Sequence, residues 1–506
     1  MSGTPSLRPS RPRPHRLADL AGALGLPAPA ADATITGVTH DSAAVRPGDL
    51  LAALPGSRTH GARYVPAAVA AGAVAVLTDP AGAELAAAAG VPLLVADRPR
   101  ALLGALAALV YDDPTARMLV LGVTGTNGKT TTAYLLEEAL RAAGHVTGLV
   151  GTVETRVAGE SVPSKRTTPE ATDLQAAFAA MAERGVTAVA MEVSSHALAL
   201  GRVDGTRFAA GAFTNLSQDH LDFHADMEDY FAAKALLFDG RCRHEVVNVD
   251  DAYGRRLVRE GTVAVSADGD PAAAWRVVEP APEPAGGQRF RVLGPAGVDL
   301  PVTLRLPGAF NAANALVAIA TLASVGVDPG VAAKGVEQTA VPGRMEPVDA
   351  GQPWAAYVDY AHKPGALRAV LDAARAGTPG RLIVVVGAGG DRDAGKRPAM
   401  GEIAARGSDL LIVTDDNPRT EDPATVRAAV RAGAIAVPPG ERGEVVEVGD
   451  RREAVAAAVA AARPGDTVVV AGKGHEQGQE VAGVVHPFDD RVVLRAAIEA
   501  AHGSGR

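Results

Sequence analysis

The stretch TGTNGKTT, residues 124–131, lies between two segments of different character. Residues 118–123 form a short apolar run that is typical of a buried β-strand, and YLLEEALRAAG, residues 134–144, has the apolar spacing of a helix. A glycine-rich loop between a strand and a helix presents backbone N–H groups and a helix N-terminus to phosphates. The stretch therefore predicts a phosphate-binding loop in an α/β domain.

Two residues of this loop carry the chemistry that phosphate binding needs. The Lys129 ammonium can reach β- and γ-phosphates, and the Thr130 hydroxyl can bind Mg²⁺. Val123 stands where the ordinary motif has glycine, so the loop is a variant with glycine at positions 122 and 125. The residues that we expect to contact a nucleotide are Gly125, Thr126, Asn127, Gly128, Lys129, Thr130 and Thr131.

Short β-branched runs alternate with Ala-rich helical stretches along the whole chain, which is typical of α/β domains with mostly parallel sheets. The runs that we predict as buried strands are 74–77, 118–123, 187–193, 382–386, 410–414 and 467–471. A chain of 506 residues is too long for one ordinary core. We predict a disordered tail and three domains, at 1–16, 17–113, 114–341 and 342–506, with a loop at 279–287 in the middle domain.

Composition excludes several classes of protein. A formal charge of −9 argues against a general nucleic-acid binder, and no apolar run approaches the ~18 to 20 residues of a membrane helix. The first residues, rich in Pro, Ser and Arg, have no apolar stretch of the secretory kind. With Cys242 as the only cysteine, no internal disulfide can form. We expect a cytoplasmic protein in which Cys242 is a small buried hydrophobe; a reactive thiol is the alternative.

Further candidates for chemistry follow the phosphate loop. Glu192 ends the apolar run TAVAMEV, where it is either a metal ligand or a solvated loop residue. Lys234 lies among aromatic and aliphatic residues in YFAAKALLF, so it must extend its amine to solvent or change its chemistry. Only 7 of the 49 basic residues are lysine, which indicates that lysine is kept where function needs it. Five of them lie in the phosphate loop, in AAKALLF and in the polar segments DYAHKP, GDRDAGKRP and AGKGHE: Lys129, Lys234, Lys363, Lys396 and Lys473.

Six segments in order, from about residue 118 to residue 348, resemble the Mur ligase family of ATP-dependent amide ligases: GTNGKTT, MEVSSHAL, TNLSQDHLDFH, AAKALLF, PGAFNAANALVA and VPGRMEPV. The resemblance implies that CO₂ carbamylates Lys234 and that the carbamate helps to hold Mg²⁺ with Glu192 and His220. Carbamylation requires a primary amine, which arginine lacks. The catalytic residues implied are Lys129, Glu192, His220 and Lys234, and the further ATP contacts are Asn311, Asn314, Arg344 and His362.

The segment THDS, residues 39–42, and the segment SRTHG, residues 57–61, resemble the UDP-binding domain of the family member that performs the third addition. Ala43 and Ala44 stand where that pattern often has arginine, and Leu200 stands where it often has glutamine. A polar turn between two strands is the alternative for the first segments. The residues implied to bind the UDP-muramoyl dipeptide are His40, Ser42, Ser57, Arg58, Thr59, Thr167, Thr168, Ser194 and Arg202.

Three predicted strands of the last domain end in polar loops, which should share one crevice in a Rossmann-like α/β domain. Two guanidiniums and two carboxylates there suit diaminopimelate, and DNPR, residues 416–419, marks the diaminopimelate-adding branch of the family. A surface salt-bridge cluster is the alternative. The residues concerned are Arg392, Asp416, Asn417, Pro418, Arg419, Gly472 and Glu476.

The resemblance thus implies three α/β domains: a UDP-binding domain, a central ATPase domain of the P-loop type, and a domain for the incoming amino acid. It implies a ligase that uses ATP, Mg²⁺ and lysine carbamylation to join diaminopimelate to UDP-N-acetylmuramoyl-L-alanyl-D-glutamate through an acyl phosphate. We expect a monomer. A ligase adding lysine, alanine or alanyl-alanine, and a non-catalytic nucleotide or muropeptide sensor, are the alternatives, and the stereochemistry of the diaminopimelate stays open.

Overall fold

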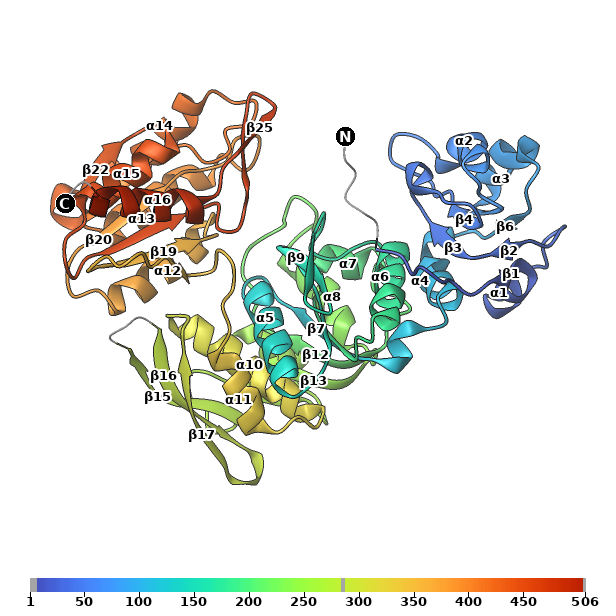
Figure 1. Cartoon of the computed structure of the whole chain (residues 1–506), viewed down its shortest axis with the longest axis horizontal. Helices are drawn as coiled ribbons and strands as arrows, with labels where there is room; N and C mark the ends of the chain where they lie inside the picture. The colour runs from blue at the N-terminus through green and yellow to red at the C-terminus, as the bar shows by residue number, and fades with distance from the viewer. Residues whose placement is uncertain (1–6, 284–286, 504–506) are drawn as a thin grey trace. The chain divides into compact units, whose positions relative to one another are not determined.

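The computed structural model describes residues 7–283 and 287–503. The chain forms two compact units, of which the first comprises Met1–Val265 with Val317–Gly335 and the second comprises Ser266–Leu316 with Val336–Arg506. Both units are α/β, and most of their strands pair in parallel, as the sequence predicts (Figure 1). Each of the six predicted strands is present within one residue of its expected ends.

The N-terminal part of the first unit contains a parallel sheet in the order β3-β4-β5-β6. Side chains alternate between its faces, so Leu50 and Leu77 join one core cluster while Leu51 and Val76 join another. The elements are β1 (His15–Arg16), α1 (Leu17–Ala23), β2 (Thr34–Ile35), β3 (Gly37–Thr39), β4 (Asp49–Ala52), α2 (Val65–Ala70), β5 (Ala75–Thr78), α3 (Pro80–Ala86), β6 (Leu93–Val95) and α4 (Pro99–Val110).

The rest of the first unit is built on a sheet in the order β10-β9-β8-β11-β7-β12-β13-β14. Its middle strands are parallel and fully buried, which places the loops after β7 and β11 at one edge. The elements are β7 (Leu119–Thr124), α5 (Lys129–Ala142), β8 (Thr147–Val150), β9 (Glu154–Val157), β10 (Glu160–Pro163), α6 (Ala171–Glu183), β11 (Ala188–Glu192), α7 (Ser195–Ala199), β12 (Phe208–Phe213), α8 (Met227–Ala235), β13 (Cys242–Asn248), α9 (Ala252–Leu257) and β14 (Val263–Ser266).

The second unit begins with an antiparallel meander of β15 (Trp275–Pro282), β16 (Gln288–Gly294) and β17 (Val298–Leu304). The chain continues through α10 (Ala309–Ser324) and α11 (Pro329–Glu337), of which residues Val317–Gly335 belong to the first unit. The predicted loop at 279–287 is wrong for residues 279–282, which belong to β15; residues 284–286 lie outside the described part. The pairing with β16 shifts register between Val278 and Ala281, where Glu279 has a φ of 54°. A β-bulge thus accommodates the proline-rich segment without ending the strand.

The C-terminal part of the second unit has a sheet in the order β18-β19-β23-β20-β21-β22, parallel except for β18. The elements are β18 (Glu346–Pro347), β19 (Ala355–Asp359), α12 (Pro364–Ala376), β20 (Leu382–Val386), α13 (Lys396–Gly407), β21 (Leu410–Val413), α14 (Pro423–Ala436), β22 (Glu444–Glu447), α15 (Arg451–Ala461), β23 (Thr467–Ala471), β24 (Gly478–Val481), β25 (Val484–Pro487) and α16 (Asp490–Gly503).

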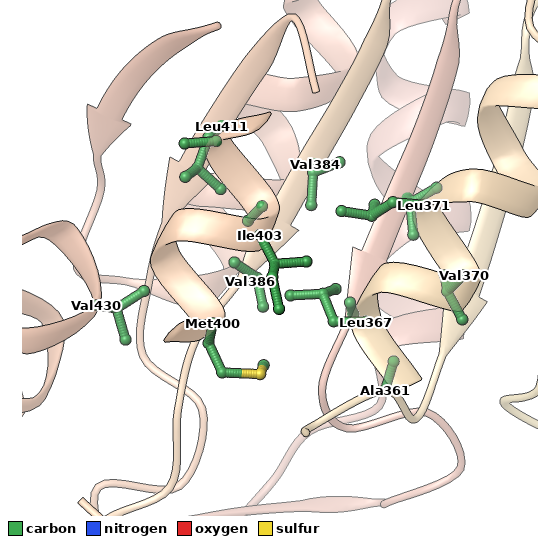
Figure 2. Packing of buried hydrophobic residues seen from close by; sticks show 14 of the residues in the cluster. Ala361, Leu367, Val370, Leu371, Val384, Val386, Met400, Ile403, Leu411 and Val430 are labelled. Atoms are coloured by element: carbon green, nitrogen blue, oxygen red, sulfur yellow. The ribbon is translucent and has the colours of Figure 1, made fainter. Parts of the chain in front are cut away.

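Helices cover both faces of this C-terminal sheet. Val384 and Val386 point to α12, α13 and α14, whereas Ile383 and Val385 point to α15 and α16. Figure 2 shows the first of these cores, with side chains of α12, β20 and α13 packed together: Leu367, Leu371, Val384, Val386, Met400 and Ile403. Burying each such side chain stabilises the folded state by about 1.5–3 kcal/mol relative to leaving it exposed. This packing holds in place the strand ends from which the polar loops leave.

Two expectations about single segments have clear outcomes. Cys242 is buried, its thiol donates to the Leu237 carbonyl at 3.1 Å, and burial raises its pKa to about 12, so the prediction of a buried hydrophobe is confirmed. The disordered tail is wrong for residues 8–16, because Arg8 forms a buried ion pair with Asp49 and residues 15–16 form β1. Across residues 7–283 and 287–503, no helix combines the length and apolar composition needed to cross a bilayer.

Candidate active site

The predicted phosphate loop leaves β7 and enters α5 at Lys129. Gly125 has a φ of 151°, and a Cβ there would lie 1.9 Å from the Thr214 hydroxyl oxygen, so only glycine fits. The Lys129 ammonium donates to the carbonyls of Gly125 and Thr126 at 2.8 and 2.9 Å. The loop is thus folded tightly around the amine that would meet a phosphate, at the N-terminus of a 14-residue helix.

Glu192 lies beside this loop because β11 pairs in parallel with β7 and ends level with it. Its buried carboxylate accepts hydrogen bonds from the Thr130 hydroxyl at 3.0 Å, from the Thr152 N–H at 2.6 Å and from the Thr152 hydroxyl at 3.1 Å. The reading of Glu192 as a solvated loop residue is therefore wrong. Sequence reasoning missed Thr152, which lies just after β8, a strand that was not among those predicted.

Lys234 lies on α8 and is buried, so the expectation that its amine extends to solvent is wrong. The Nζ atom donates to the Gly125 carbonyl at 2.7 Å and lies 4.6 Å from the centre of the Tyr230 ring. His220, in a left-handed conformation with φ 53°, packs edge-on against the same Tyr230 ring at 6.0 Å and against His196 at 4.9 Å. The structure therefore gathers Lys234 and His220 around Tyr230, next to the phosphate loop.

The side chains at this edge suit a hard cation. Carboxylate and hydroxyl oxygens, of the kind that Glu192 and Thr130 offer, are ligands that Mg²⁺ prefers. Among the described residues, no three His, Cys, Asp or Glu side chains come together in a metal-binding cluster.

The residues expected to bind the muramoyl peptide form a hydrogen-bonded chain around Glu192. The Thr152 and Thr167 hydroxyl oxygens are hydrogen-bonded at 3.0 Å, and the Thr168 hydroxyl donates to the Glu192 carbonyl at 2.8 Å. Ser194 donates its N–H to Thr168 at 3.1 Å. Among the other side chains nearby, the Arg202 guanidinium pairs with Glu170 at 2.9 Å. Burial lowers the pKa of Arg202.

The residues expected to bind the uridine nucleotide lie in the N-terminal part of the same unit. The His40 Nδ1 is 3.0 Å from the Thr172 hydroxyl of α6, and Ser42 begins a short 3₁₀ turn, Ser42–Ala44, capped by the Asp41 carboxylate. The segment 57–59 is exposed. These residues form polar turns beside the sheet, and the structure places His40 against the part of the unit that carries the peptide residues.

In the second unit, the expected nucleotide residues form two groups. The Asn311 amide donates to the Pro307 carbonyl at 2.8 Å, and the Asn314 amide donates to the Asn311 oxygen at 3.2 Å. Elsewhere in this unit, the Arg344 guanidinium lies 4.6 Å from the Tyr360 ring centre, and His362 packs against that ring at 4.5 Å. The Tyr360 ring thus contacts residues of two segments, VPGR at 341–344 and DYAH at 359–362.

Tyr360 also contacts His475, with ring centres 4.9 Å apart. Burial lowers the pKa of His362 and of His475 to about 4, so both are neutral at pH 7. The His362 Nδ1–H donates to the Tyr360 carbonyl at 2.8 Å, because a carbonyl can only accept. This bond leaves the His362 Nε2 as an acceptor.

The loops after β21 and β23 meet as expected from parallel strands. The buried Lys473 ammonium donates to the Asn417 amide oxygen at 3.0 Å and pairs with Glu476 at 3.1 Å, and the Asn417 amide donates to Glu476 at 2.8 Å. Gly472 is required, since a Cβ would lie 2.5 Å from Asp416. Lys473 was not among the expected ligands, although the scarcity of lysine had marked it.

Arg419 joins this cluster through the hairpin of β24 and β25, which sequence reasoning missed. Its backbone, with φ 55°, donates to the Glu480 carbonyl at 2.9 Å, and its guanidinium lies 3.4 Å from the Glu480 carboxylate. The guanidinium also donates to the Gly390 carbonyl at 2.5 Å. Arg392 is exposed and takes part in none of the hydrogen bonds described for this cluster, so its convergence with Arg419 stays a prediction.

Three families of domain match the chain in order: "Mur ligase family, catalytic domain" at 34–111, "Mur ligase middle domain" at 123–322, and "Mur ligase, glutamate ligase domain" at 343–474. The UDP-N-acetylmuramoyl-L-alanyl-D-glutamate–2,6-diaminopimelate ligase of Streptomyces coelicolor is 58% identical over 98% of this chain and 99% of its own length. The chain belongs to the Mur ligase family.

Two further Mur ligases support this membership. The ligase of the same name from Corynebacterium glutamicum is 53% identical over 94% of each chain. A solved structure of a UDP-N-acetylmuramoyl-L-alanyl-D-glutamate–2,6-diaminopimelate ligase has a TM-score of 0.68 and 31% identity over 92% of this chain and 95% of its own. The similarity covers every part of the Mur ligase fold, so it bears on the nucleotide loop and on the amino-acid loops alike.

Proposed function

We propose that this Mur ligase uses ATP to join an amine of diaminopimelate to the D-glutamate carboxylate of UDP-N-acetylmuramoyl-L-alanyl-D-glutamate, releasing ADP and phosphate. One observation carries the proposal furthest. The Thr130 hydroxyl, the Glu192 carboxylate, the Thr152 hydroxyl and the Thr167 hydroxyl form a continuous hydrogen-bond chain. This chain links the expected phosphate loop to the expected peptide site, so a phosphoryl donor and an acceptor carboxylate would meet beside Glu192.

The reaction has two steps that this geometry supports. The D-glutamate carboxylate oxygen attacks the γ-phosphorus, the bond to the β-phosphate bridging oxygen breaks, and ADP leaves. The amine nitrogen then attacks the acyl phosphate carbon, loses a proton, and phosphate leaves with its oxygen. Lys129 holds the charge that develops on the phosphate oxygens, and the backbone N–H groups at the start of α5 orient them.

The same edge of the sheet would hold Mg²⁺, with ligands from Thr130, Glu192, His220 and a carbamylated Lys234. When bound, the ion neutralises phosphate charge. Lys234 suits carbamylation because its amine is buried next to the loop, where a carbamate would supply the oxygen ligands that an ammonium cannot. Glu192 is already oriented by the two hydrogen bonds from Thr152, which leaves lone pairs for a metal.

For the incoming amino acid, we propose the loops around Asp416, Arg419 and Glu476. Carboxylates there can hold an ammonium group, and Arg419 can hold the distal carboxylate of diaminopimelate in a charge-assisted pair. Lys473, Asn417 and Glu480 keep these groups in place. Asn311, Asn314, Arg344 and His362 remain proposed nucleotide contacts, and we propose a cytoplasmic, monomeric enzyme.

The test is a coupled assay with purified protein. Phosphate release should require ATP, the UDP-muramoyl dipeptide and diaminopimelate together, and mass spectrometry should find the UDP-muramoyl tripeptide. A panel with meso- and LL-diaminopimelate, lysine, alanine and alanyl-alanine tests the amino acid. If the enzyme turns over lysine in preference, lysine and not diaminopimelate is the substrate. Nucleotide binding without any amide product would favour a sensor.

A further inference from the structure

Residues 8–11 form an arm that contacts two separate parts of the first unit. The Arg8 Nη1 lies 2.8 and 2.7 Å from the two carboxylate oxygens of Asp49, and these side chains are only 7% and 3% exposed. Farther along, the N–H groups of Ser10 and Arg11 donate to the Glu183 carboxylate at 2.7 and 2.8 Å. Asp49 begins β4 and Glu183 ends α6, so the arm connects the N-terminal sheet to the helix that follows the expected peptide residues Thr167 and Thr168 in the chain.

Asp49 holds the segment that precedes it. The Arg46 N–H donates to its carboxylate at 2.8 Å, and a Cβ on Gly37 of β3 would lie 2.3 Å from the same carboxylate. The Arg8 Nη2 reaches the Ala44 carbonyl at 3.4 Å, at the end of the turn that contains Ser42. Arg8 and Asp49 therefore close the loop between β3 and β4, on which the proposed uridine-nucleotide contacts His40 and Ser42 lie.

The buried charge of Asp49 needs a cation, because an unpaired buried carboxylate is costly. Among the ion pairs of the described residues, Asp49 takes part only in the one with Arg8. The loop itself carries Ala43 and Ala44, at positions where the pattern it resembles often has arginine. Arg8 thus supplies from outside the loop a guanidinium that the loop lacks at those positions.

Arg8 also acts on the adjoining helix. Burial raises the pKa of Asp173 on α6, and the charges of His40 and Arg8 oppose that rise. The neighbouring Thr172 is the partner of His40. The Arg8 charge thus acts on the first turn of α6, next to the residue that His40 contacts.

We propose that the arm is a positioning element for the UDP-sugar site, in which the Arg8–Asp49 pair fixes the loop of His40 and Ser42 and the Glu183 anchor fixes the arm to α6. Arg8 itself touches no substrate in this scheme. The inference rests on the proposed function, because it assigns the loop to the UDP-muramoyl dipeptide. It predicts that loosening the arm weakens binding of that substrate and leaves the chemical step intact.

Arg8→Ala tests the proposal by separating KM from kcat. We expect the KM for the UDP-muramoyl dipeptide to rise about tenfold, with kcat and the KM values for ATP and diaminopimelate within about twofold of wild type. Arg8→Lys keeps the charge but loses the planar guanidinium, so its KM for the dipeptide should lie between those of wild type and Arg8→Ala. Glu183→Gln should give a rise of about two- to threefold, because it weakens only the anchor.

Arg13→Ala is the matched control, since Arg13 belongs to the same tail but is 75% exposed and lies 3.7 Å from Asp112. It should leave all three KM values unchanged. Asp49→Asn with Arg8→Ala should together cost no more than the larger single change, as expected of a pair.

Calorimetric titration of the dipeptide supplies a second readout that does not need turnover. An unchanged KM and Kd for the dipeptide in Arg8→Ala would overturn the inference, and so would equal losses for all three substrates with a lowered Tm. Wild-type protein that neither binds nor uses the dipeptide would instead refute the proposed function.

Discussion

The loop after β7 and the loops after β21 and β23 prepare ligand sites in different ways. The first is a contiguous stretch whose shape comes from backbone, with Gly125 and Gly128 at positive φ and Lys129 bonded to two carbonyls. The second depends on side chains from distant segments, since Asn417 and Lys473 are 56 residues apart in the chain. Backbone shape is set by a few residues, whereas a side-chain network is changed by each of its members.

This difference has consequences for substitution. In the phosphate loop, the Lys129 ammonium is the one side-chain group that we expect to stabilise phosphate charge, and the backbone sets the shape of the loop. Removing that ammonium should therefore abolish nearly all turnover. In the amino-acid loops, several side chains hold one another in place: the Asn417 amide, the Glu476 carboxylate and the Lys473 ammonium. Truncation there should give graded losses that affect one substrate, because each residue is one of several contacts.

The largest effect should come from Lys129→Ala. Removing the ammonium eliminates phosphate charge stabilisation of several kcal/mol, so we expect turnover below about 1% of wild type in a phosphate-release assay. Lys334→Ala, which changes an exposed lysine on α11, should be fully active. Substantial activity in the Lys129 variant would show that the loop does not hold the reacting phosphate.

Lys234→Ala should lose nearly as much, about two orders of magnitude in kcat, if its carbamate supplies metal ligands. Lys234→Arg is the matched variant, because it keeps the charge but cannot be carbamylated, and we expect it to be equally inactive. Millimolar short-chain carboxylates should partly restore the alanine variant alone. Wild-type activity in the arginine variant would mean that the buried cation, and not a carbamate, is what the site requires.

Arg419→Ala should show the graded behaviour of the second site. Loss of one partner of a desolvated charge pair costs about 2–5 kcal/mol, so kcat/KM for diaminopimelate should fall roughly 30-fold or more. The KM values for ATP and the dipeptide should stay within about twofold, and lysine should lose little. Arg392→Ala, at an exposed position, should have a smaller effect; equal losses for lysine and diaminopimelate would show that Arg419 does not read the distal carboxylate.

The smallest effect concerns acid stability of the second unit. Because burial lowers the pKa of His362 and His475 to about 4, the unfolded chain binds more protons than the folded one between pH 6.5 and about 4. Their stabilising contribution is present above the unfolded pKa of about 6.5 and is lost as the pH falls toward 4. From pH 7 to pH 5 we expect a loss of roughly 1–2 kcal/mol per histidine.

Urea unfolding followed by tryptophan fluorescence can measure this loss, because both tryptophans, Trp275 and Trp354, belong to the second unit. The double variant His362→Asn and His475→Asn should show a flatter dependence on pH between 7 and 5. If the slope is the same in the variant and the wild type, the two histidines are not the groups responsible.

The sequence by itself determined the α/β class, the buried strands and the phosphate loop. Strands such as Leu382–Val386 consist of β-branched and apolar residues throughout, and such runs can only be buried. The loop at 124–131 needs particular residues at consecutive positions, because Gly125 fits where no side chain can. Local patterns of this kind are visible in a chain before it folds.

Tertiary structure decided which distant groups meet. Thr152 became a partner of Glu192 because β8 and β11 are neighbours, and Glu480 reached Arg419 through a hairpin that the alternation of elements did not predict. The arm around Arg8 has the composition of a disordered tail, yet a buried Asp49 pairs with it. Composition describes the segment only in isolation. Whether the arm becomes ordered depends also on the Asp49 carboxylate, which loses its water and needs a cation only when the sheet has folded.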